Sequence, residues 1–361
     1  TIKGTDISDF ILSASFPHGI ITEELVCEIN LDNSGEDFTN AFKARDTIQF
    51  KMDFSDGTTV QFKGEVEEIK AIEGGFFNLK IKGAHFTAQL LDVMVTAEFI
   101  GAQISVIKTT LIADHLPDFT STNVEENETT IDIKFVNKAL LDCLIELDIQ
   151  GDEDTYIDFD KDIHTFKRES KQNLNIHFTP DDSLIQLRGL GTDSAEVRNK
   201  ITVYGEVGDL PVIHVSEDSA SQTTFRTKES VITDNTIIDE AQAKTVGDAS
   251  QTQLKDPKSQ GSVLSLFWTG INPGDKAYVI SNPHKIHDLF RIVKFTFRIP
   301  EETLEVFFNQ ERSIPKLFKD RIKKDLAQER IVNPFNMTHS FNFTFDNENK
   351  IDGAASADIV V

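Results

Sequence analysis

The feature that most constrains the fold of this chain is a pattern of short strands and tight turns that occurs twice. The two strand-rich segments cover about residues 5–96 and 200–310, and a stretch with two helix-like patterns separates them. Closely spaced short strands with turn residues between them are typical of small barrels or sandwiches. We therefore predict an α+β protein, mainly β, in which two similar small β-barrels flank an inserted α+β domain.

The length of the chain favours several packed units. It has 361 residues, and its 39% of hydrophobic residues is enough for more than one core. No apolar run approaches the roughly 18 residues that a membrane span needs, and the first residues lack a secretory signal pattern. The regions we expect are a first barrel in 1–96, an inserted α+β domain in 97–198, a second barrel in 199–312 and a C-terminal extension in 313–361.

The first barrel is predicted from residue alternation. In 76–82, apolar side chains alternate with asparagine and lysines, so that one face of the strand is dry. Asp56-Gly57 indicates a hairpin because both positions of its turn need a positive φ. Gly74-Gly75 marks the next turn. The four strands expected here are 24–31, 47–54, 58–69 and 76–82.

The middle region has helical spacing. A helix is expected at 103–116, where Pro117 ends it, and a second one after Asn137, which can cap it. Gly151 is a suitable end for the second helix. The strands expected to follow are 155–159, 163–166, 174–178 and 183–187.

The third segment returns to short strands. Asn272-Pro273-Gly274-Asp275 predicts a turn, because proline presets φ and glycine accepts a positive φ. A helix is expected at about 236–254, capped by Asp234 or Asn235, after a polar region. The strands expected in this segment are 199–205, 263–268, 276–280, 289–298 and 303–309.

The C-terminal extension carries the candidate partner-binding residues. A helix-like stretch at 315–330 has an apolar face inside the only basic cluster of an acidic chain, and three phenylalanines further on alternate with polar residues as in a strand. Such a strand can fold back on its own domain or add to a neighbouring chain, and the basic face can be simply solvated. The predicted contact residues are Phe318, Ile322, Lys323, Lys324, Phe341, Phe343 and Phe345.

The net charge and the number of cysteines argue against some classes of protein. The net charge of −24, from 60 acidic and 36 basic residues, argues against a protein that grips nucleic acid through its phosphates. Solubility is the simplest explanation; a surface that DNA passes without binding is a second one, and adaptation to high salt is a third. Cys27 and Cys143 are too few for a disulfide framework and are interpreted as small buried side chains.

No catalytic or cofactor motif is found in the sequence, so no catalytic residue, cofactor or metal ligand is assigned. The acidic run 152–162 suggests calcium, but an EF-hand loop needs glycine at its sixth position, where this run places isoleucine or phenylalanine. Asp158, Asp160 and Asp162 are expected on one face of a strand, as a solvated strand edge or hairpin, and an ion near this run stays an open question. The histidines are interpreted as core or surface residues.

The order of these features resembles the tail hub, or baseplate hub, proteins of tailed phages, archaeal tailed viruses and related contractile injection systems. The likeness covers roughly residues 5–310 and lies in the order of elements and in weak local patterns. The stretches that carry it are Ile29–Asn33, Asp46–Ile48, Asp56-Gly57, Phe62–Ile69, Ile81–Asp92, Ala139–Leu144, Asp154–Asp158, Asn199–Gly205, the alanine-rich helix, Asn272–Asp275 and Phe290–Val293.

The resemblance implies a homotrimer in which two barrels per subunit present a pseudo-sixfold ring. Such a ring joins a sixfold tail tube or distal tail protein to a threefold tip, spike or tape-measure protein, and DNA passes through its central channel without specific binding. It implies a structural protein of the virion tail, made in the host cytoplasm. About 50 residues follow the second barrel, too few for the C-terminal peptidase or lysozyme of some relatives, so no enzyme activity is expected.

Two other functions stay open from the sequence. The first is a β-rich adhesin or carbohydrate-binding tail module, which would expose an aromatic groove and need not be trimeric. The second is a cell-wall hydrolase whose paired carboxylates are hidden among the 60 acidic residues. Oligomeric state separates the first from a hub, and a turnover assay on peptidoglycan separates the second.

Overall fold

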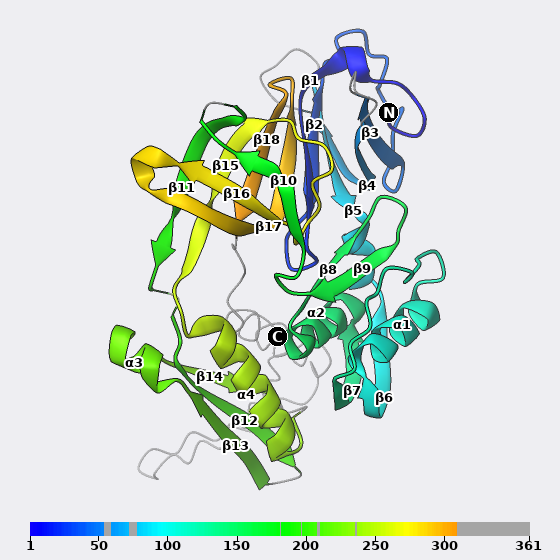
Figure 1. Cartoon of the computed structure of the whole chain (residues 1–361). Helices are drawn as coiled ribbons and strands as arrows, with labels where there is room; N and C mark the ends of the chain where they lie inside the picture. Colours follow the sequence, from blue (N-terminus) through cyan, green and yellow to red (C-terminus); the bar gives the residue numbers. More distant parts are fainter. Residues whose placement is uncertain are drawn as a thin grey trace, which may run out of the picture. The chain divides into compact units, whose positions relative to one another are not determined.

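The computed structural model describes residues 1–308 apart from 54–58, 72–77, 181, 196, 208–209 and 235–236. Within that part the chain is α+β and mainly β, as predicted (Figure 1). The first half contains η1 Ser8–Phe10, β1 Ile11–Gly19, β2 Val26–Leu31, β3 Thr47–Asp53, β4 Thr59–Ala71, β5 Leu79–His85, η2 Phe86–Leu91, β6 Met94–Gln103, α1 Ile104–His115, β7 Thr130–Ala139, α2 Leu140–Gly151, β8 Glu153–Ile157 and β9 Ile163–Lys167. The second half contains β10 Gln172–Phe178, β11 Leu184–Asp193, β12 Lys200–Val207, β13 Leu210–Glu217, α3 Ser219–Phe225, β14 Glu229–Thr233, α4 Glu240–Leu254, β15 Lys258–Leu266, β16 Lys276–Ser281, η3 Asn282–His284, β17 Ile286–Ile299 and β18 Thr303–Phe308.

One large sheet contains strands from both strand-rich segments. Its order is β11-β15-β18-β17-β1-β2-β5-β4-β3, and β16 pairs with both β17 and β10. The two sets meet where β1 pairs antiparallel with β17, with Phe16 opposite Phe297. A strand has only two hydrogen-bonding edges. Because β2 and β17 occupy those of β1, the pairings of the described residues form an open path, and two separate closed barrels are not seen in them.

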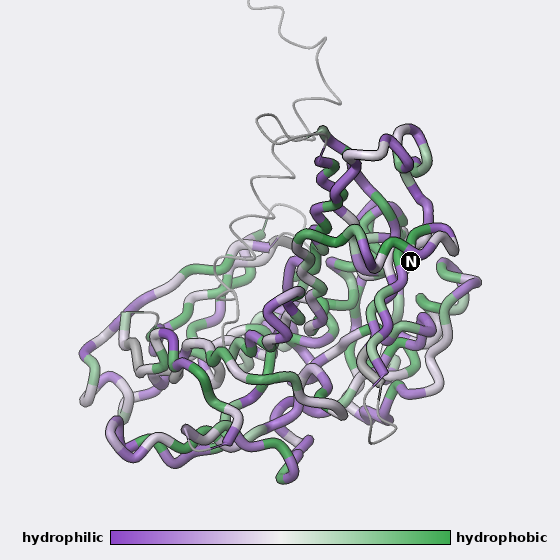
Figure 2. The backbone as a smooth tube through the Cα atoms, turned by 90° about the horizontal axis from the view of Figure 1, so that it is seen from above, coloured by the Kyte–Doolittle hydropathy of each residue, from purple (hydrophilic) through white to green (hydrophobic). Residues whose placement is uncertain are grey.

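The core of the large sheet is rich in phenylalanine. Phe16, Phe62, Phe295 and Phe308 are fully buried in one cluster that draws on both strand sets. The rings of Phe16 and Phe50 are stacked, with centroids 4.4 Å apart. Figure 2 shows hydrophobic residues interspersed with hydrophilic ones along the backbone. Alternation along a strand places every second side chain on the same face of the sheet. The phenylalanine content is thus explained by core filling in a β structure.

A second core lies between the antiparallel pair β6 and β7, the helices α1 and α2, and the β8–β9 hairpin. The helix predicted at 103–116 is confirmed as α1. The predicted capping role of Asn137 is wrong: this residue lies in β7 with φ 48°, and the helix starts three residues later, after Ala139. α2 ends at Gly151, as predicted, and the next residue, Asp152, takes the left-handed conformation.

Residues 200–254 form a smaller sheet, and one helix, α4, packs on it. The strand order is β13-β12-β14, and α4 packs on β12 and β13 through Ala243 and Val246. The helix begins at Glu240, and its N-cap is Asp239, whose side chain accepts a hydrogen bond from Gln242 N, so the predicted cap at residue 234 or 235 is wrong. The region expected to be polar between strand and helix contains β13, α3 and β14.

Several local predictions can be checked directly. The turn at 272–275 is confirmed, with Gly274 at φ +85° and Asp275 N donating to Asn272 O. Both cysteines are buried, and they are not joined in a disulfide. The turns at Asp56-Gly57 and Gly74-Gly75 and the whole C-terminal extension lie outside the described residues. In the described part of the chain, no helix is both long and apolar enough to cross a membrane.

Candidate functional site

The residues predicted to contact a partner all lie beyond the described part of the chain, because they start at Phe318. The structure instead draws attention to the β8–β9 hairpin, where several distant segments meet. Tyr156 on β8 forms a bridge with Ile20 at the end of β1, and Asp162 forms one with Thr120 in the loop after α1. Lys63 on β4 forms an ion pair with Asp160 at 2.7 Å. The hairpin therefore connects the helical region to the large sheet.

The turn of this hairpin contains the aspartates that the sequence placed on a strand face. The strand face is wrong, because β8 ends at Ile157 and β9 begins at Ile163, but the alternative of a hairpin is confirmed. Oδ1 of Asp158 accepts hydrogen bonds from the backbone N–H groups of Asp160 and Asp162, and Lys161 has φ 65°. An aspartate that accepts from the backbone in this way builds a turn in place of an extended strand.

The turn brings two carboxylates to one imidazole. Nε2 of His164, on β9, lies 3.2 Å from Oδ2 of Asp158 and 3.6 Å from Oδ2 of Asp162. Nδ1 of the same ring lies 3.2 Å from the Tyr156 hydroxyl, and the two rings stack with centroids 4.6 Å apart. The three side chains Asp158, Asp162 and His164 form what we call the turn cluster. Sequence reasoning missed His164, although it stands two residues after the last aspartate of the run.

Asp162 is held firmly from the neighbouring loop. Its Oδ1 accepts from the Thr120 hydroxyl and from Thr122 N at 3.0 Å, and its Oδ2 accepts from Asn123 Nδ2 at 2.5 Å. Burial raises the pKa of this carboxyl, but the hydrogen bonds from Thr120 and Asn123 lower it more, so that the net shift is downward. The side chain is therefore an ionised group in a fixed position.

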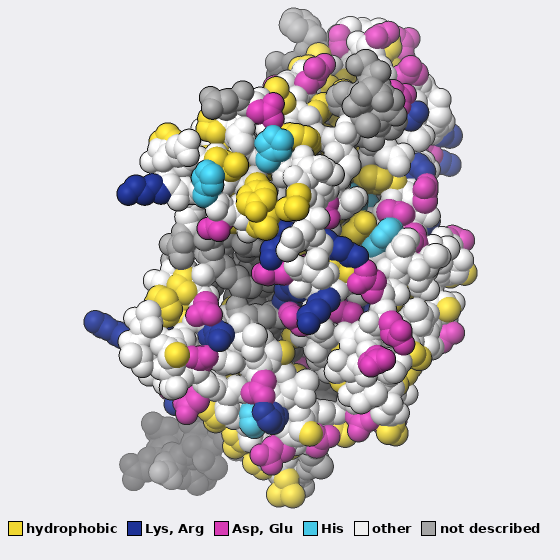
Figure 3. Space-filling view, viewed as in Figure 1, with side chains coloured by type: hydrophobic (Ala, Val, Ile, Leu, Met, Phe, Trp, Pro, Cys, Tyr) yellow, Lys and Arg dark blue, Asp and Glu magenta, His cyan; other side chains and the backbone are white. Residues whose placement is uncertain are grey.

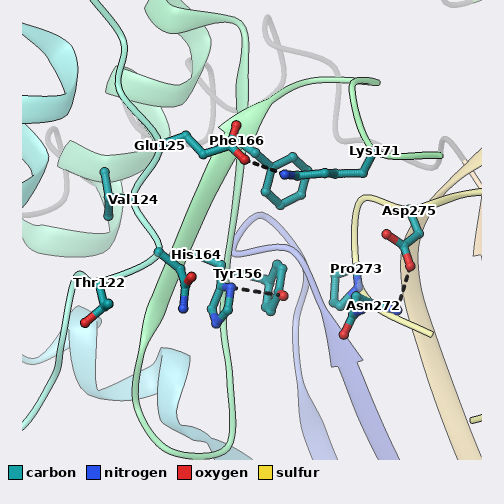
Figure 4. A pocket seen from close by; sticks show the side chains of 11 residues that line it. Thr122, Val124, Glu125, Tyr156, His164, Phe166, Lys171, Asn272, Pro273 and Asp275 are labelled. Carbon is teal, nitrogen blue, oxygen red and sulfur yellow. Dashed lines mark hydrogen bonds and ion pairs between the residues drawn. The ribbon is translucent and has the colours of Figure 1, made fainter. Parts of the chain in front are cut away.

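Two cavities flank the turn cluster. One, of about 300 Å³, lies between the hairpin, the loop 122–125 and the turn 272–275, and Figure 4 shows Tyr156 and His164 side by side in its lining. The other, of about 280 Å³, is lined by Asp158 and His164 together with aromatic side chains that include Trp268. Tyr156, His164 and Asn272 line both cavities. His164 is thus reached from two sides and Asp158 from one, whereas Asp162 is buried.

Below the hairpin lies a buried histidine, His18 of β1. Its Nε2–H donates to the carbonyl oxygen of Ile157 at 3.0 Å. Burial lowers the pKa of His18 to about 4, so that the ring is neutral at pH 7. Aromatic rings of Phe159 and Phe295 contact it. This histidine is a core residue of the junction between hairpin and sheet.

Two buried ionic groups fix the hairpin from its other end. Asp154 of β8 accepts from Arg291 of β17 at 2.5 Å and from Arg168 at 3.2 Å. Nζ of Lys108 on α1 lies 2.5 Å from Asp148 of α2 and 2.6 Å from Glu153 of β8. Burial of Asp148 raises its pKa to about 6. Together these groups join both helices, the hairpin and the large sheet.

Charge on the surface is dispersed in the view of Figure 3. Acidic side chains lie over many elements of the face shown and do not gather in one patch there. The arrangement of the described residues offers positions for binding and for assembly. Its clearest chemical feature is the turn cluster with its two cavities.

The fold of this chain is that of tail proteins from phage-like particles and a related secretion machine. The 43 kDa tail protein of prophage MuSo2 from Shewanella oneidensis matches it with a TM-score of 0.58 at 14% identity, covering 85% of this chain and 96% of that chain. A tail protein from Neisseria meningitidis MC58 gives a TM-score of 0.57 at 10% identity, with 85% and 94% covered.

A third solved structure comes from E. coli. It is a component of the type VI secretion system that is described as similar to the tail proteins gp27 and gp5 of bacteriophage T4. It matches with a TM-score of 0.52 at 11% identity, covering 85% of this chain and 75% of that chain. No family model and no curated protein matches the sequence. The resemblance to tail proteins seen in the sequence is therefore confirmed at the level of the fold.

Proposed function

We propose that this protein is a structural component of the tail of a virion or of a related contractile particle, and that it acts there as a trimeric hub. The observation that carries the proposal is the shared fold, which extends over 85% of this chain in the tail proteins of Shewanella and Neisseria. A match over almost the whole of both chains favours the same kind of part in an assembly over a borrowed domain.

In this proposal the strands β1–β5 and β15–β18 take the place of the two barrel modules, and the strand 199–205, which was predicted in the second barrel, is β12 of the smaller sheet. Three subunits would then present six similar modules, so that a threefold assembly matches a sixfold tube or distal tail protein above it. A threefold tip or spike, or a tape-measure protein, would lie below. The net charge of −24 supports a channel that DNA passes without binding. The regions 1–96, 97–198, 199–312 and 313–361 stay a prediction.

The mass of the full chain in solution tests the oligomeric part of this proposal. Light scattering coupled to size exclusion should give about 120 kDa, three times the 40.5 kDa of one chain. Imaging of that species should show a ring with a central channel. A chain that stays monomeric when mixed with tail-tube, distal tail and tip proteins of its own particle would contradict the hub and favour the adhesin or carbohydrate-binding module.

The C-terminal extension is proposed to contact the tip or spike. A chain ended after Asn309 should stay folded and trimeric but lose attachment to the tip, with Phe318, Ile322, Lys323, Lys324, Phe341, Phe343 and Phe345 as contact residues. A truncated chain that unfolds would show that these residues belong to the core. No enzyme activity is proposed, and measurable turnover of peptidoglycan by the purified chain would overturn that part.

A further inference from the structure

The turn cluster has the geometry of a metal site. The ligand atoms of Asp158, Asp162 and His164 all lie within 4.8 Å of one another. In a tetrahedral zinc site with bonds of about 2.0–2.1 Å, neighbouring ligand atoms are separated by about 3.4 Å. The distances from His164 Nε2 to the two aspartate oxygens, 3.2 and 3.6 Å, bracket that separation. The third separation, between the two carboxylate oxygens, is at most 4.8 Å, so the three groups converge closely enough to share one ion.

Each ligand is oriented by a second set of contacts. With Nδ1–H of His164 donating to the Tyr156 hydroxyl, Nε2 presents its lone pair to the two carboxylates. Oδ1 of Asp158 is fixed by two backbone N–H groups, which leaves Oδ2 facing the imidazole. Asp162 is fixed by the loop 120–123. Such outer contacts are what holds the ligands of metal centres in place.

The charge of the site also favours a cation. Among the described residues, His164 is the ion-pair partner of both Asp158 and Asp162. The nearby lysines are engaged elsewhere: Lys63 pairs with Asp160, and Nζ of Lys161 lies over the rings of Phe86 and Phe119. In the described part of the chain the two carboxylates therefore converge without a lysine or arginine paired to them, and the cavity lined by Asp158 and His164 leaves room for water on the ion.

We propose that Asp158, Asp162 and His164 bind a divalent first-row transition ion, of the class of Zn²⁺ or Co²⁺. One imidazole nitrogen with two carboxylate oxygens suits these ions, whereas Ca²⁺ and Mg²⁺ select oxygen ligands alone. The ion joins the two sides of the β8–β9 turn, and it thereby holds Asp162 where this residue contacts the loop after α1. This proposal depends only on these three residues and is independent of the proposed function as a tail hub.

The experiment is a titration of the full chain, stripped with a chelator, with Co²⁺. The chain has one tryptophan, Trp268, and it lines the same cavity as Asp158 and His164. Bound Co²⁺ should quench its fluorescence and show the visible absorption of a cobalt centre. We expect saturation at one ion per chain, displacement by Zn²⁺ and no displacement by an equal concentration of Ca²⁺. Displacement by Ca²⁺ or the lack of saturation would overturn the proposal.

Matched variants locate the ion. Asp158→Asn keeps Oδ1 for the turn and removes the negative charge, and His164→Gln removes the imidazole. Each should weaken Co²⁺ binding at least about tenfold. His177→Gln is the control, because His177 lies beside both Trp268 and an aspartate, with Nε2 3.4 Å from Asp182. Equal binding by all three variants would overturn the assignment.

A crystal soaked with Zn²⁺ gives an answer that does not depend on how the variants fold. An anomalous difference peak measured at the zinc edge should lie between the three ligand atoms of the turn cluster. A peak elsewhere on the chain, with none at the cluster, would contradict the proposal even if the titration saturates. This readout also differs from any test of the tail role, since it needs neither trimers nor partner proteins.

Discussion

Arg291 of β17 and Asp154 of β8 form a buried ion pair in which Nη1 and Oδ1 are 2.5 Å apart and both side chains are almost completely shielded from water. Nε of Arg168 lies 3.2 Å from the same oxygen. Burial raises the pKa of Asp154, but the two guanidinium groups lower it more, so the carboxylate is ionised. One carboxylate therefore joins the β8–β9 hairpin to the large sheet.

Asp154→Asn should lower the free energy of unfolding by about 3–5 kcal/mol, because it leaves buried guanidinium charge without its carboxylate. Denaturant unfolding followed by circular dichroism measures this change. The control is Asp152→Asn, since this carboxylate is 55% exposed and 3.7 Å from Arg168, and its loss should cost about 1 kcal/mol or less. Equal losses in the two variants would show that burial of the pair has no energetic weight.

The buried group around Lys108 predicts a second, pH-dependent change. Lys108→Met leaves Asp148 and Glu153 buried without a cation, and we expect a loss of about 3–5 kcal/mol at pH 7. Asp148→Asn keeps Lys108 paired with Glu153 and should cost far less. The measurement is the free energy of unfolding of both variants and the wild type. A larger loss in Asp148→Asn would contradict this account of the group.

The sign of the pH effect follows from the raised pKa of Asp148, about 6 in the folded chain against 3.8 for the free group. The folded state binds the proton more tightly, so the wild type should gain stability relative to Asp148→Asn as the pH falls from about 6 to 4. Unfolding curves at several pH values test this. A difference between the two chains that does not change with pH would contradict it.

For His18 the expected change of stability with pH has the opposite sign. Its pKa is about 4 in the folded chain and 6.5 in the unfolded one, so the unfolded state binds the proton more tightly. The wild type should therefore lose about 3 kcal/mol relative to His18→Gln as the pH falls from 6.5 to 4. The exposed His287 is the control, and His287→Gln should show no such difference. A parallel pH profile for wild type and His18→Gln would refute the prediction.

Gly274 and Gly270 allow the cost of backbone strain to be measured apart from the cost of a steric clash. It has φ +85°, and a Cβ there would lie 2.3 Å from Cζ of Phe166. Gly270 has φ +68° with open space around it. Gly270→Ala should cost about 1–2 kcal/mol for the backbone alone, and Gly274→Ala should cost at least about 1 kcal/mol more for the displaced ring. Thermal unfolding compares the two, and equal costs would rule out the contact with Phe166.

The sequence predicts elements well where the signal is local. α1 is correct within one residue at each end, since Pro117 stops it and its apolar residues have helical spacing. The turn at 272–275 is likewise set by its own proline and glycine. The strand β1 was missed, because serines and a proline interrupt its pattern and its partner β17 lies in the other half of the chain.

The turn cluster shows why a site is harder to predict than a helix. The alternation of aspartates in 158–162 is the pattern of a strand, but two backbone hydrogen bonds to Asp158 fold it into a turn. In that turn Asp160 forms an ion pair with Lys63, whereas Asp158 and Asp162 both lie beside His164. Periodicity identifies which residues share a face only after the type of element is known.

The pairing of β1 with β17 sets the order in which this protein can be completed. Ala14 lies opposite Ile299, so about 280 residues separate two neighbours of the central sheet. During synthesis β1 leaves the ribosome long before the strand that covers its second edge exists. The large sheet can be completed only after translation of β17 and β18, and until then the second edge of β1 is open to pairing with other chains.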